Sequence, residues 1–259
     1  MIKGFLIGKG ISYSYSKNIH EGIGLANYSI CDCDNLNDFF NKDLDYDFFN
    51  VTIPYKKEII KYLDVLDPIS INIGAVNLVI KRGNKLFGYN SDYYGFLMFL
   101  KKNDINFENK RIGVLGTGGA SQVVQRIALE QNAKSLIVVS REEYKYYDNF
   151  ITYDELNNYC FDILINATPV GTSPNINESL IDFDKLKVNP NLVCIDLIYN
   201  PYNTKFLIDA KNHGYNAYNG IDMLIYQAIY SYYFIDESYH NYIYDDELID
   251  KIRKNIDYR

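Results

Sequence analysis

The chain has 259 residues, of which 47% are hydrophobic, and its formal net charge is −7 at neutral pH. This length suits one large domain or two modest ones, and the hydrophobic fraction is sufficient for a sizeable buried core. The negative charge argues against a surface that binds nucleic acid or an anionic membrane. The four cysteines lack zinc-site spacing, so we expect a reduced, cytoplasmic protein without a metal. We expect neither a secretory leader nor a membrane span, because no apolar segment has the required pattern or length.

The first part of the chain alternates short apolar strands with polar loops. Strands are predicted over Phe5–Ile7 and 28–33, and a loop rich in glycine and serine follows the first of them. In this loop Ser14 and Ser16 stand close together, just before a helical pattern over 18–26. Ser16 is either the cap of that helix or, together with Ser14, part of a site for a small polar ligand.

The next strand, predicted over 47–51, leads into a segment that contains a proline and two lysines. Pro54 has no backbone N–H for a strand ladder, and it therefore ends the strand. A helix is predicted over 55–63, which places Lys56 near the helix start, where the dipole mildly disfavours a cation. From these local features alone, Lys56 is one more surface lysine beside Lys57.

Two polar residues accompany the following elements. A strand is predicted over 73–80, and it contains Asn77, whose amide needs a hydrogen-bond partner if it is buried. This strand is expected to form a hairpin with 85–89. Asp92 then precedes a helical pattern over 93–102, and its carboxylate has a structural explanation as the N-cap of that helix.

The centre of the chain carries a glycine-rich turn between an apolar strand, 112–115, and a helical pattern, 121–131. Such glycines let the backbone approach a pyrophosphate, and the N–H groups at the helix start attract phosphate. Ser121 stands where this motif usually has its third glycine, so a plain strand-to-helix turn remains the alternative. The residues of the turn that would contact a dinucleotide are Gly116, Gly118, Gly119 and Ala120.

The strand after this helix, predicted over 136–139, ends at Ser140 and Arg141. In NAD-dependent enzymes an acidic residue at this place binds the 2′-hydroxyl of the ribose. Arg141, with Lys145 one helical turn later, suits a 2′-phosphate instead. The pattern favours NADP over NAD, although Glu142 lies nearby and a solvated arginine is the simpler alternative.

The last third of the chain adds strands over 161–166 and 192–197, a helix over 204–213, and polar groups after both strands. Thr168 and Tyr199 follow the carboxyl ends of these strands, where open α/β sheets bind ligands.

A final apolar helix opens at Gly220, and its Gln227 shares one helix face with Met223 and Leu224. A glutamine in an apolar stripe is either a misplaced residue of the core or a ligand-binding group. The tail over 245–256 is predicted to be an amphipathic helix.

Seven short motifs stand in the same order as in the shikimate dehydrogenase family, which the chain resembles over nearly its whole length. The chain departs from the family pattern at Gly10 and Lys17, where proline is usual, at Tyr13, where histidine is usual, and at Tyr93, where glycine is usual. The matching segments are Gly8–His20, Asn50–Lys56, Gly74–Asn77, Asn90–Asp92, Gly116–Ser121, Asn166–Thr168 and Gly220–Ala228.

The resemblance implies an α/β fold with two domains. Residues 1–91 and 220–259 would form a discontinuous substrate-binding domain with a mixed sheet. Residues 92–219 would form a Rossmann-type NADP-binding domain, and the cleft between the two domains would hold both ligands.

The resemblance also implies reversible reduction of 3-dehydroshikimate to shikimate by NADPH, in the shikimate pathway of aromatic amino-acid biosynthesis. Lys56 and Asp92 resemble the catalytic pair, in which the lysine exchanges a proton with the reacting hydroxyl and the aspartate holds the substrate. The further implied substrate-binding residues are Ser14, Ser16, Thr52, Asn77, Tyr199 and Gln227. The implied cofactor-binding residues, besides the glycine turn, are Ser140, Arg141, Lys145, Thr168 and Gly220.

Three other functions stay open. The first is an enzyme of the same class that accepts quinate or uses NAD. The second is a non-catalytic ligand sensor on the same fold, and the third is a structural Rossmann-like module. The presence of both Lys56 and Asp92 argues against a sensor, and the substrate-side motifs argue against a structural module. We expect a small-molecule partner rather than nucleic acid or a membrane, and a chain that is either a monomer or a homodimer.

Overall fold

The computed structural model describes residues 1–42, 44–142, 149–187, 189–241 and 246–256. The chain forms two compact units, one made of residues 1–96 and 224–256 and the other of residues 97–223. Each unit contains its own sheet, which confirms the predicted α/β class. Among the described residues, no helix combines the length and apolar character that a membrane span requires.

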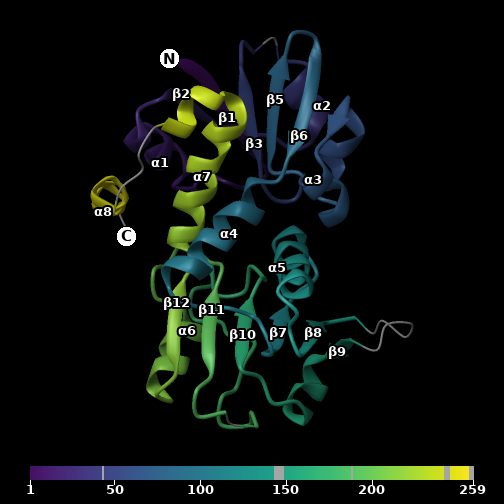
Figure 1. The fold of residues 1–259 in the computed structure, drawn as a ribbon, viewed down its shortest axis with the longest axis vertical. Coiled ribbons are helices and arrows are strands. Elements are labelled where there is room, and N and C mark those ends of the chain that lie inside the picture. The colour runs from purple at the N-terminus through teal and green to yellow at the C-terminus, as the bar shows by residue number, and fades with distance from the viewer. Residues whose placement is uncertain (43, 143–148, 188, 242–245, 257–259) are drawn as a thin grey trace. The chain divides into compact units, whose positions relative to one another are not determined.

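The first unit contains a mixed sheet of six strands in the order β2-β1-β3-β5-β6-β4. Figure 1 labels the first five of these strands in this order. β1 runs parallel to β2 and β3, whereas β5 runs antiparallel to β3 and β6. The strands are β1 (Ile2–Gly8), β2 (Ala26–Asp32), β3 (Phe48–Val51), β4 (Val65–Leu66), β5 (Leu78–Arg82) and β6 (Lys85–Tyr89). The helices that accompany them are α1 (Ser16–Ile23), α2 (Leu36–Phe40), η1 (Glu58–Tyr62), α3 (Pro68–Ile73), α4 (Ser91–Lys102), α7 (Ile221–Ile235), η3 (Glu237–Asn241) and α8 (Asp246–Asn255).

Both faces of this sheet are covered by helices. Neighbouring residues of a strand point to opposite faces, as Phe48 and Phe49 of β3 do. The Phe48 ring lies 6.0 Å from that of Tyr232 on α7, and the Phe49 ring lies 4.9 Å from that of Phe39 on α2. All four side chains are almost fully buried, so β3 runs through the centre of the core.

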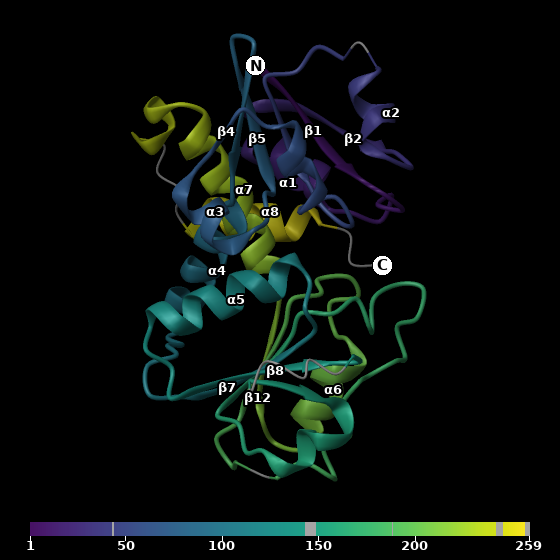
Figure 2. The same ribbon diagram turned by 90° about the vertical axis from the view of Figure 1, so that its right-hand side faces the viewer.

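The second unit has a sheet of six parallel strands in the order β12-β11-β10-β7-β8-β9. The chain starts in the middle at β7, moves outward to β9, and returns to fill the other half from β10 to β12. This is the doubly wound order, which reverses direction between β7 and β10. Figure 2 shows α5 and α6 on opposite faces of the sheet. The elements are β7 (Arg111–Leu115), α5 (Gly119–Glu130), β8 (Ser135–Ser140), β9 (Phe150–Thr152), η2 (Tyr153–Asn158), β10 (Ile163–Asn166), β11 (Val193–Asp196), α6 (Lys205–Asn212) and β12 (Asn216–Asn219).

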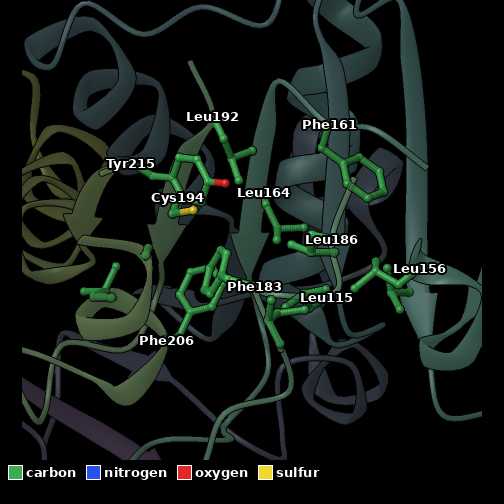
Figure 3. Packing of buried hydrophobic residues seen from close by; sticks show 14 of the residues in the cluster. Leu115, Leu156, Phe161, Leu164, Phe183, Leu186, Leu192, Cys194, Phe206 and Tyr215 are labelled. Atoms are coloured by element: carbon green, nitrogen blue, oxygen red, sulfur yellow. The ribbon is translucent and has the colours of Figure 1, made fainter. Parts of the chain in front are cut away.

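One hydrophobic cluster holds this second sheet to α6 (Figure 3). Leu115, Leu164 and Cys194 come from three neighbouring strands, and each has no exposed surface. Phe206 of α6 belongs to the same cluster and is 2% exposed. The apolar side chains of β7, β10 and β11 on this face of the sheet are therefore in the core, and the polar residues that end β10 and β11, Asn166 and Asp196, are buried as well.

The predicted strand over 73–80 is wrong in its first half. Residues 68–73 form α3, which the sequence analysis missed, and β5 begins only at Leu78. The signals for this helix are local: the Asp67 carboxylate accepts hydrogen bonds from the first turn, and Pro68 occupies its first position. Gly74 ends the helix with a φ of 70°, a left-handed conformation that favours glycine.

Gly95 allows α4 to approach the backbone of α7. A Cβ atom at this position would lie 2.7 Å from the backbone nitrogen of Gln227 and 2.9 Å from its Cα. Gly95→Ala is therefore expected to push the two helices apart and to lower the free energy of unfolding by about 1–3 kcal/mol, a typical cost of overpacking. Chemical denaturation measures this change.

The matched control is Gly22→Ala on α1. A Cβ atom there would meet only one side chain, that of Ile252, with its Cγ1 at 3.1 Å and its Cβ at 3.8 Å, and no backbone atom within 4 Å. Because alanine favours a helix by up to about 1 kcal/mol over glycine, this variant should be nearly neutral or slightly stabilising. Equal destabilisation of both variants would contradict the packing argument.

Candidate active site

Four polar segments meet at one edge of the first sheet. β1 and β3 are parallel, and β6 runs in the same direction because each of β3 and β6 is antiparallel to β5. The segments that follow β1, β3 and β6, and the residue that precedes β5, therefore lie at the same edge. The segment after β1 carries Ser14 and Ser16, and the segment after β3 carries Thr52 and Lys56. Asp92 follows β6, and Asn77 directly precedes β5.

Lys56 and Asp92 are in direct contact. The Nζ of Lys56 donates a hydrogen bond to the Oδ2 of Asp92 at 2.7 Å, and the two side chains are 19% and 10% exposed. The predicted helix over 55–63 is wrong, because Lys56 lies in a turn and only residues 58–62 form a short 3-10 helix, η1. The carbonyl of Lys56 instead accepts from the N–H of Val76 at 2.8 Å, which ties the turn to the segment before β5. Lys57, by contrast, is exposed.

Asp92 does not cap α4, so its structural explanation is wrong. The cap is Asn90, whose Oδ1 accepts from the backbone N–H of Tyr93 at 3.1 Å. Asp92 lies in the first turn of α4, where the helix dipole favours a negative charge. Its carboxylate is directed to Lys56 instead, so the ion pair is its structural role.

Ser14 and Ser16 form a buried pair of hydroxyls, 8% and 4% exposed. The Oγ of Ser14 donates to the Oγ of Ser16 at 3.0 Å and accepts from the Ser16 N–H at 3.2 Å. Ser16 is the first residue of α1, and Tyr15 stands at the cap position without a side-chain hydrogen bond. The interpretation of Ser16 as a helix cap is therefore wrong, which leaves the ligand site as the open interpretation.

The loop that carries these serines is fixed by Asp32 at the end of β2. Its carboxylate accepts from the N–H groups of Gly10 and Ile11, at 2.9 and 3.0 Å. Gly10 has a φ of 67°, which proline cannot adopt, and proline has no N–H to donate. At Gly10, where this chain departs from the family pattern, a hydrogen bond thus holds the loop.

Asn77 and Gln227 share one buried hydrogen-bond network. The N–H of Ser91 donates to the Oδ1 of Asn77 at 2.6 Å, which fixes the orientation of that amide. The Nδ2 of Asn77 then donates to the Oε1 of Gln227 at 3.3 Å, as does the Ser91 hydroxyl at 3.1 Å. The Nε2 of Gln227 donates one hydrogen to the carbonyl of Leu224 at 3.0 Å. Within the described part of the chain, the second N–H of Gln227 has no acceptor, so it is available to a ligand.

His20 is a packing residue. It has no exposed surface, its Nδ1 lies 2.7 Å from the hydroxyl of Tyr232, and its ring stacks on Tyr28 at 3.8 Å. Burial lowers the pKa of His20 to about 3, so the ring is neutral at neutral pH.

The glycine turn of the second unit has the geometry of an anion cradle at the switch point of the sheet. Gly116 has a φ of 98°, and a Cβ atom there would lie 2.8 Å from the Cγ2 of Thr168. Gly118 precedes α5 without a side-chain cap, and a Cβ atom there would meet nothing within 4 Å. α5 therefore begins without a side chain at the cap position that accepts from its first N–H groups, and such a helix start fits a dinucleotide phosphate. Gly119 and Ala120 form the first turn of α5.

Arg141 directly follows β8 and is exposed. Its guanidinium lies close enough to Tyr153 to lower the pKa of that phenol, which burial raises to about 12. Ser140 is buried and accepts from the N–H of Glu142 at 3.1 Å. Lys145 lies outside the described residues. An exposed cation at this strand end is available to a 2′-phosphate.

Comparisons with known proteins identify the family. A model of the shikimate dehydrogenase substrate binding domain matches residues 6–79. The shikimate dehydrogenase (NADP(+)) of Clostridium beijerinckii is 36% identical over 239 residues, which cover 86% of this chain and 88% of the relative. The chain belongs to the shikimate dehydrogenase family. The resemblance based on seven motifs is thereby confirmed.

Solved structures of the shikimate dehydrogenase family have the same fold. Shikimate dehydrogenase 1 from Peptoclostridium difficile is 33% identical, with a TM-score of 0.83 over 98% of this chain and 97% of that one. The enzyme from Thermus thermophilus, solved in complex with NADP(H) and shikimate, is 25% identical, with a TM-score of 0.81 over 99% of this chain and all of that one. The predicted two-domain architecture is confirmed.

The other site residues suggested by the family resemblance have diverse surroundings. Thr168 donates to the Oδ1 of Asn166 at 2.7 Å, next to the glycine turn. Tyr199 is half-buried in the segment after β11. A Cβ atom on Gly220 would lie 2.5 Å from the carbonyl oxygen of Leu197, so close packing already explains this glycine. Half-buried Thr52 directly follows β3.

Ser91 is the residue that sequence reasoning missed. Its backbone and hydroxyl connect Asn77 to Gln227, and its side chain has no exposed surface. The available signal was its place inside the motif Asn90–Asp92. No group of His, Cys, Asp or Glu side chains within the described ranges has the arrangement of a metal site. All four cysteines are free thiols.

Proposed function

We propose that this chain catalyses the reversible, NADPH-dependent reduction of 3-dehydroshikimate to shikimate. The observation that carries the proposal is the contact of 2.7 Å between Lys56 and Asp92 at the polar edge of the first sheet. Membership of a family whose relatives are named shikimate dehydrogenase (NADP(+)) supports both the reaction and the cofactor. The relative from Thermus thermophilus, crystallised with NADP(H) and shikimate, supports the pairing of these two ligands.

The reaction needs a hydride at the carbonyl carbon and a proton at its oxygen. NADPH supplies the hydride when it is bound. Lys56 supplies the proton from Nζ in reduction and receives it in oxidation. Asp92 keeps Nζ in place by its hydrogen bond and, through its second carboxylate oxygen, accepts a hydrogen bond from a substrate hydroxyl.

The polar groups around this pair would orient a polyhydroxylated acid. Gln227 offers an N–H, because its carbonyl oxygen already accepts from Asn77 and Ser91. It therefore donates to an oxygen of the substrate. The hydroxyls of Ser14, Ser16, Thr52 and Tyr199 can both donate and accept, which suits hydroxyl and carboxylate groups.

The two units would divide these tasks. The substrate-binding family model lies wholly within the first unit, which supports its role in holding dehydroshikimate. The cradle of Gly116, Gly118, Gly119 and Ala120, together with Ser140, Arg141, Lys145, Thr168 and Gly220, would serve NADPH in the second unit. The predicted boundaries at residues 91 and 220 fall within a few residues of the boundaries of the compact units. The monomer and the homodimer both remain compatible with this division.

Gln227→Ala is expected to raise the KM for dehydroshikimate by about 3–10-fold, the loss of one hydrogen bond to a substrate oxygen. The KM for NADPH should stay within about twofold, because Gln227 lies outside the nucleotide cradle. Steady-state kinetics with each ligand varied in turn measures both values.

Ser231→Ala is the matched control for this change, one helical turn further along α7. The Ser231 hydroxyl lies 3.2 Å from that of Ser91 and belongs to the same buried network. If both variants raise the KM for dehydroshikimate equally, the network matters and the direct contact of Gln227 does not.

The function is tested by following the absorbance of NADPH with saturating 3-dehydroshikimate, then with NADH, and in reverse with quinate and NADP⁺. Rapid oxidation of NADPH with dehydroshikimate supports the proposal. Faster turnover of quinate, or equal use of NADH, would move the assignment to the broader enzyme. Binding of both ligands without turnover would identify a sensor.

A further inference from the structure

Asp196 is a buried carboxylate that the proposed reaction does not use. It ends β11 and has no exposed surface. Its Oδ1 accepts from the Nδ2 of Asn166 and from the N–H of Ile198, both at 3.0 Å. Its Oδ2 accepts from the hydroxyl of Thr204 at 2.6 Å. One carboxylate thus joins the end of β10, the segment after β11 and the start of α6.

The first of these contacts leads to the cofactor side of the proposed site. The Oδ1 of Asn166 accepts from the hydroxyl of Thr168 at 2.7 Å and from its N–H at 3.1 Å. Because Asp196 holds the other end of the same amide, it determines which way the Asn166 side chain faces. The position of Thr168 beside Gly116 therefore depends on the carboxylate.

The other two contacts fix the segment that carries Tyr199. Ile198, directly before Tyr199, donates its N–H to Asp196. Thr204, five residues after Tyr199, donates its hydroxyl to Asp196 and caps α6 by accepting from the N–H of Leu207 at 3.3 Å. The chain from 198 to 204 is therefore held at both ends by the same group.

The surroundings of this carboxylate are neutral. The groups that face it are the Asn166 amide, the Ile198 N–H and the Thr204 hydroxyl. On β11 itself, burial raises the pKa of the Cys194 thiol, so this thiol is uncharged at neutral pH. Within the described ranges no cation forms an ion pair with Asp196. Burial raises the pKa of Asp196 to about 7, while the three hydrogen bonds act in the opposite direction.

We propose that Asp196 is a positioning residue which, in its ionised form, holds Thr168 and Tyr199 in register for the cofactor and the substrate. All three partners approach it as donors, and an ionised carboxylate accepts all three without a hydrogen of its own. A proton on Oδ2 would reverse the hydrogen bond with Thr204, whose hydroxyl would then accept and have to turn its own hydrogen to another acceptor. Loss of the negative charge would also weaken the hydrogen bonds from Asn166 and Ile198, because bonds to an ionised acceptor are stronger than neutral ones. Protonation therefore loosens both segments together. The inference rests on the proposed function, because its kinetic tests use NADPH and dehydroshikimate.

Asp196→Asn imitates the protonated state, because an NH₂ group then faces Thr204. We expect it to raise the KM for NADPH and for dehydroshikimate together, by about 3–10-fold, as for one lost buried hydrogen bond. Variants of the two residues that Asp196 positions should affect the ligands separately. Thr168→Ala should raise mainly the KM for NADPH, and Tyr199→Phe should raise mainly the KM for dehydroshikimate. The control is Asp162→Asn, a carboxylate just before β10 that pairs with Arg111 at 2.8 Å. It should lower stability without raising either KM.

The pH dependence gives a second test, which holds even if Asp196→Asn folds poorly. Asp196 is ionised above its pKa of about 7, so both KM values of the parent enzyme should rise as the pH falls through this value. Thr204→Val removes a hydrogen bond that lowers the pKa of Asp196, and it should move the midpoint to higher pH. Thr204→Ser keeps the hydroxyl and should keep the midpoint.

Thermal unfolding without ligands gives a readout that does not depend on activity. The folded-state pKa of Asp196 is raised from 3.8 to about 7. The ionised carboxylate is therefore held at a cost in global stability, because it is buried. This cost is absent below the lower value, where the group is protonated in both states, and it is complete once the pH has risen through the higher one. The Tm of the parent minus that of Asp196→Asn should fall as the pH rises between these two values.

A Tm difference that is constant over this range, or a pH-dependent KM that Asp196→Asn retains, would overturn the inference. A parent protein that shows the expected Tm difference but does not reduce dehydroshikimate would instead contradict the proposed function and leave the ionisation of Asp196 supported.

Discussion

Lys56→Ala is expected to lower kcat for dehydroshikimate by about 10²–10⁴-fold, the usual contribution of a placed general acid. The Nζ of Lys56 lies 2.7 Å from Asp92 and is mostly buried, so its loss removes the proposed proton donor from the polar edge of the first sheet. The KM should change much less, because the contacts proposed for Ser14, Ser16 and Gln227 would remain. Steady-state kinetics in both directions measures the two values.

Two variants serve as controls for Lys56. Lys57→Ala removes the same charge one residue away from an exposed side chain, and it should leave kcat nearly unchanged. Lys56→Arg keeps the charge but should not restore the rate, since a guanidinium hardly deprotonates and has a different shape. A folded Lys56→Ala protein with kcat within about threefold of the parent, far below the general-acid range, would contradict the assignment. Asp92 or an ordered water would then be the next candidate for the proton.

Arg141→Ala is expected to raise the KM for NADPH by about 10–100-fold, while the KM for NADH changes little. A hydrogen bond to a charged group contributes roughly 1.5–3 kcal/mol, and each 1.4 kcal/mol corresponds to about tenfold in affinity. Arg141 is exposed directly after β8, where we propose that it contacts the 2′-phosphate that distinguishes NADPH from NADH. Kinetics with both cofactors under the same conditions measures the ratio.

Arg126→Ala is the matched control for the loss of a positive charge in the second unit. Arg126 forms an ion pair with Glu130 within α5, at 2.6 Å, and should affect both cofactors equally and weakly. Arg141→Lys should fall between the parent and the alanine variant, because lysine keeps the charge without the planar fork. Equal changes for NADPH and NADH in Arg141→Ala would remove the argument for a 2′-phosphate contact.

Local signals predicted most of the second unit correctly. The apolar run over 112–115, the glycines after it and the helical pattern over 121–131 correspond to β7, the turn and α5. These signals act over a few residues, since strand propensity, turn conformation and helix periodicity depend on near neighbours. β12 was missed, because Asn216–Asn219 is short, polar and only partly buried.

Local signals were misleading where a residue's role depends on distant segments. Asp92 matched a helix cap, but Asn90 takes that position and Asp92 pairs with Lys56, which lies 36 residues earlier. Lys56 was expected near a helix start, but it lies in a turn whose carbonyl at Lys56 accepts a hydrogen bond from Val76, in the segment before β5. A polar side chain such as that of Asp92 can bond either to the nearby backbone or to a distant partner. Only the folded chain decides between the two.

The sequence by itself determined the family, the α/β class and the residue types of the site, because these depend on motifs that stay together along the chain. The tertiary structure alone decided which of these side chains meet. Asn77 and Gln227 are 150 residues apart and share a hydrogen bond because α7 packs on the first sheet. Asp196 is an ordinary acidic residue in the sequence, and only the burial of β11 among neutral groups gives it a raised pKa. The physical reason is that hydrogen bonds and desolvation depend on the order of the strands and the packing of the helices, which no local pattern specifies.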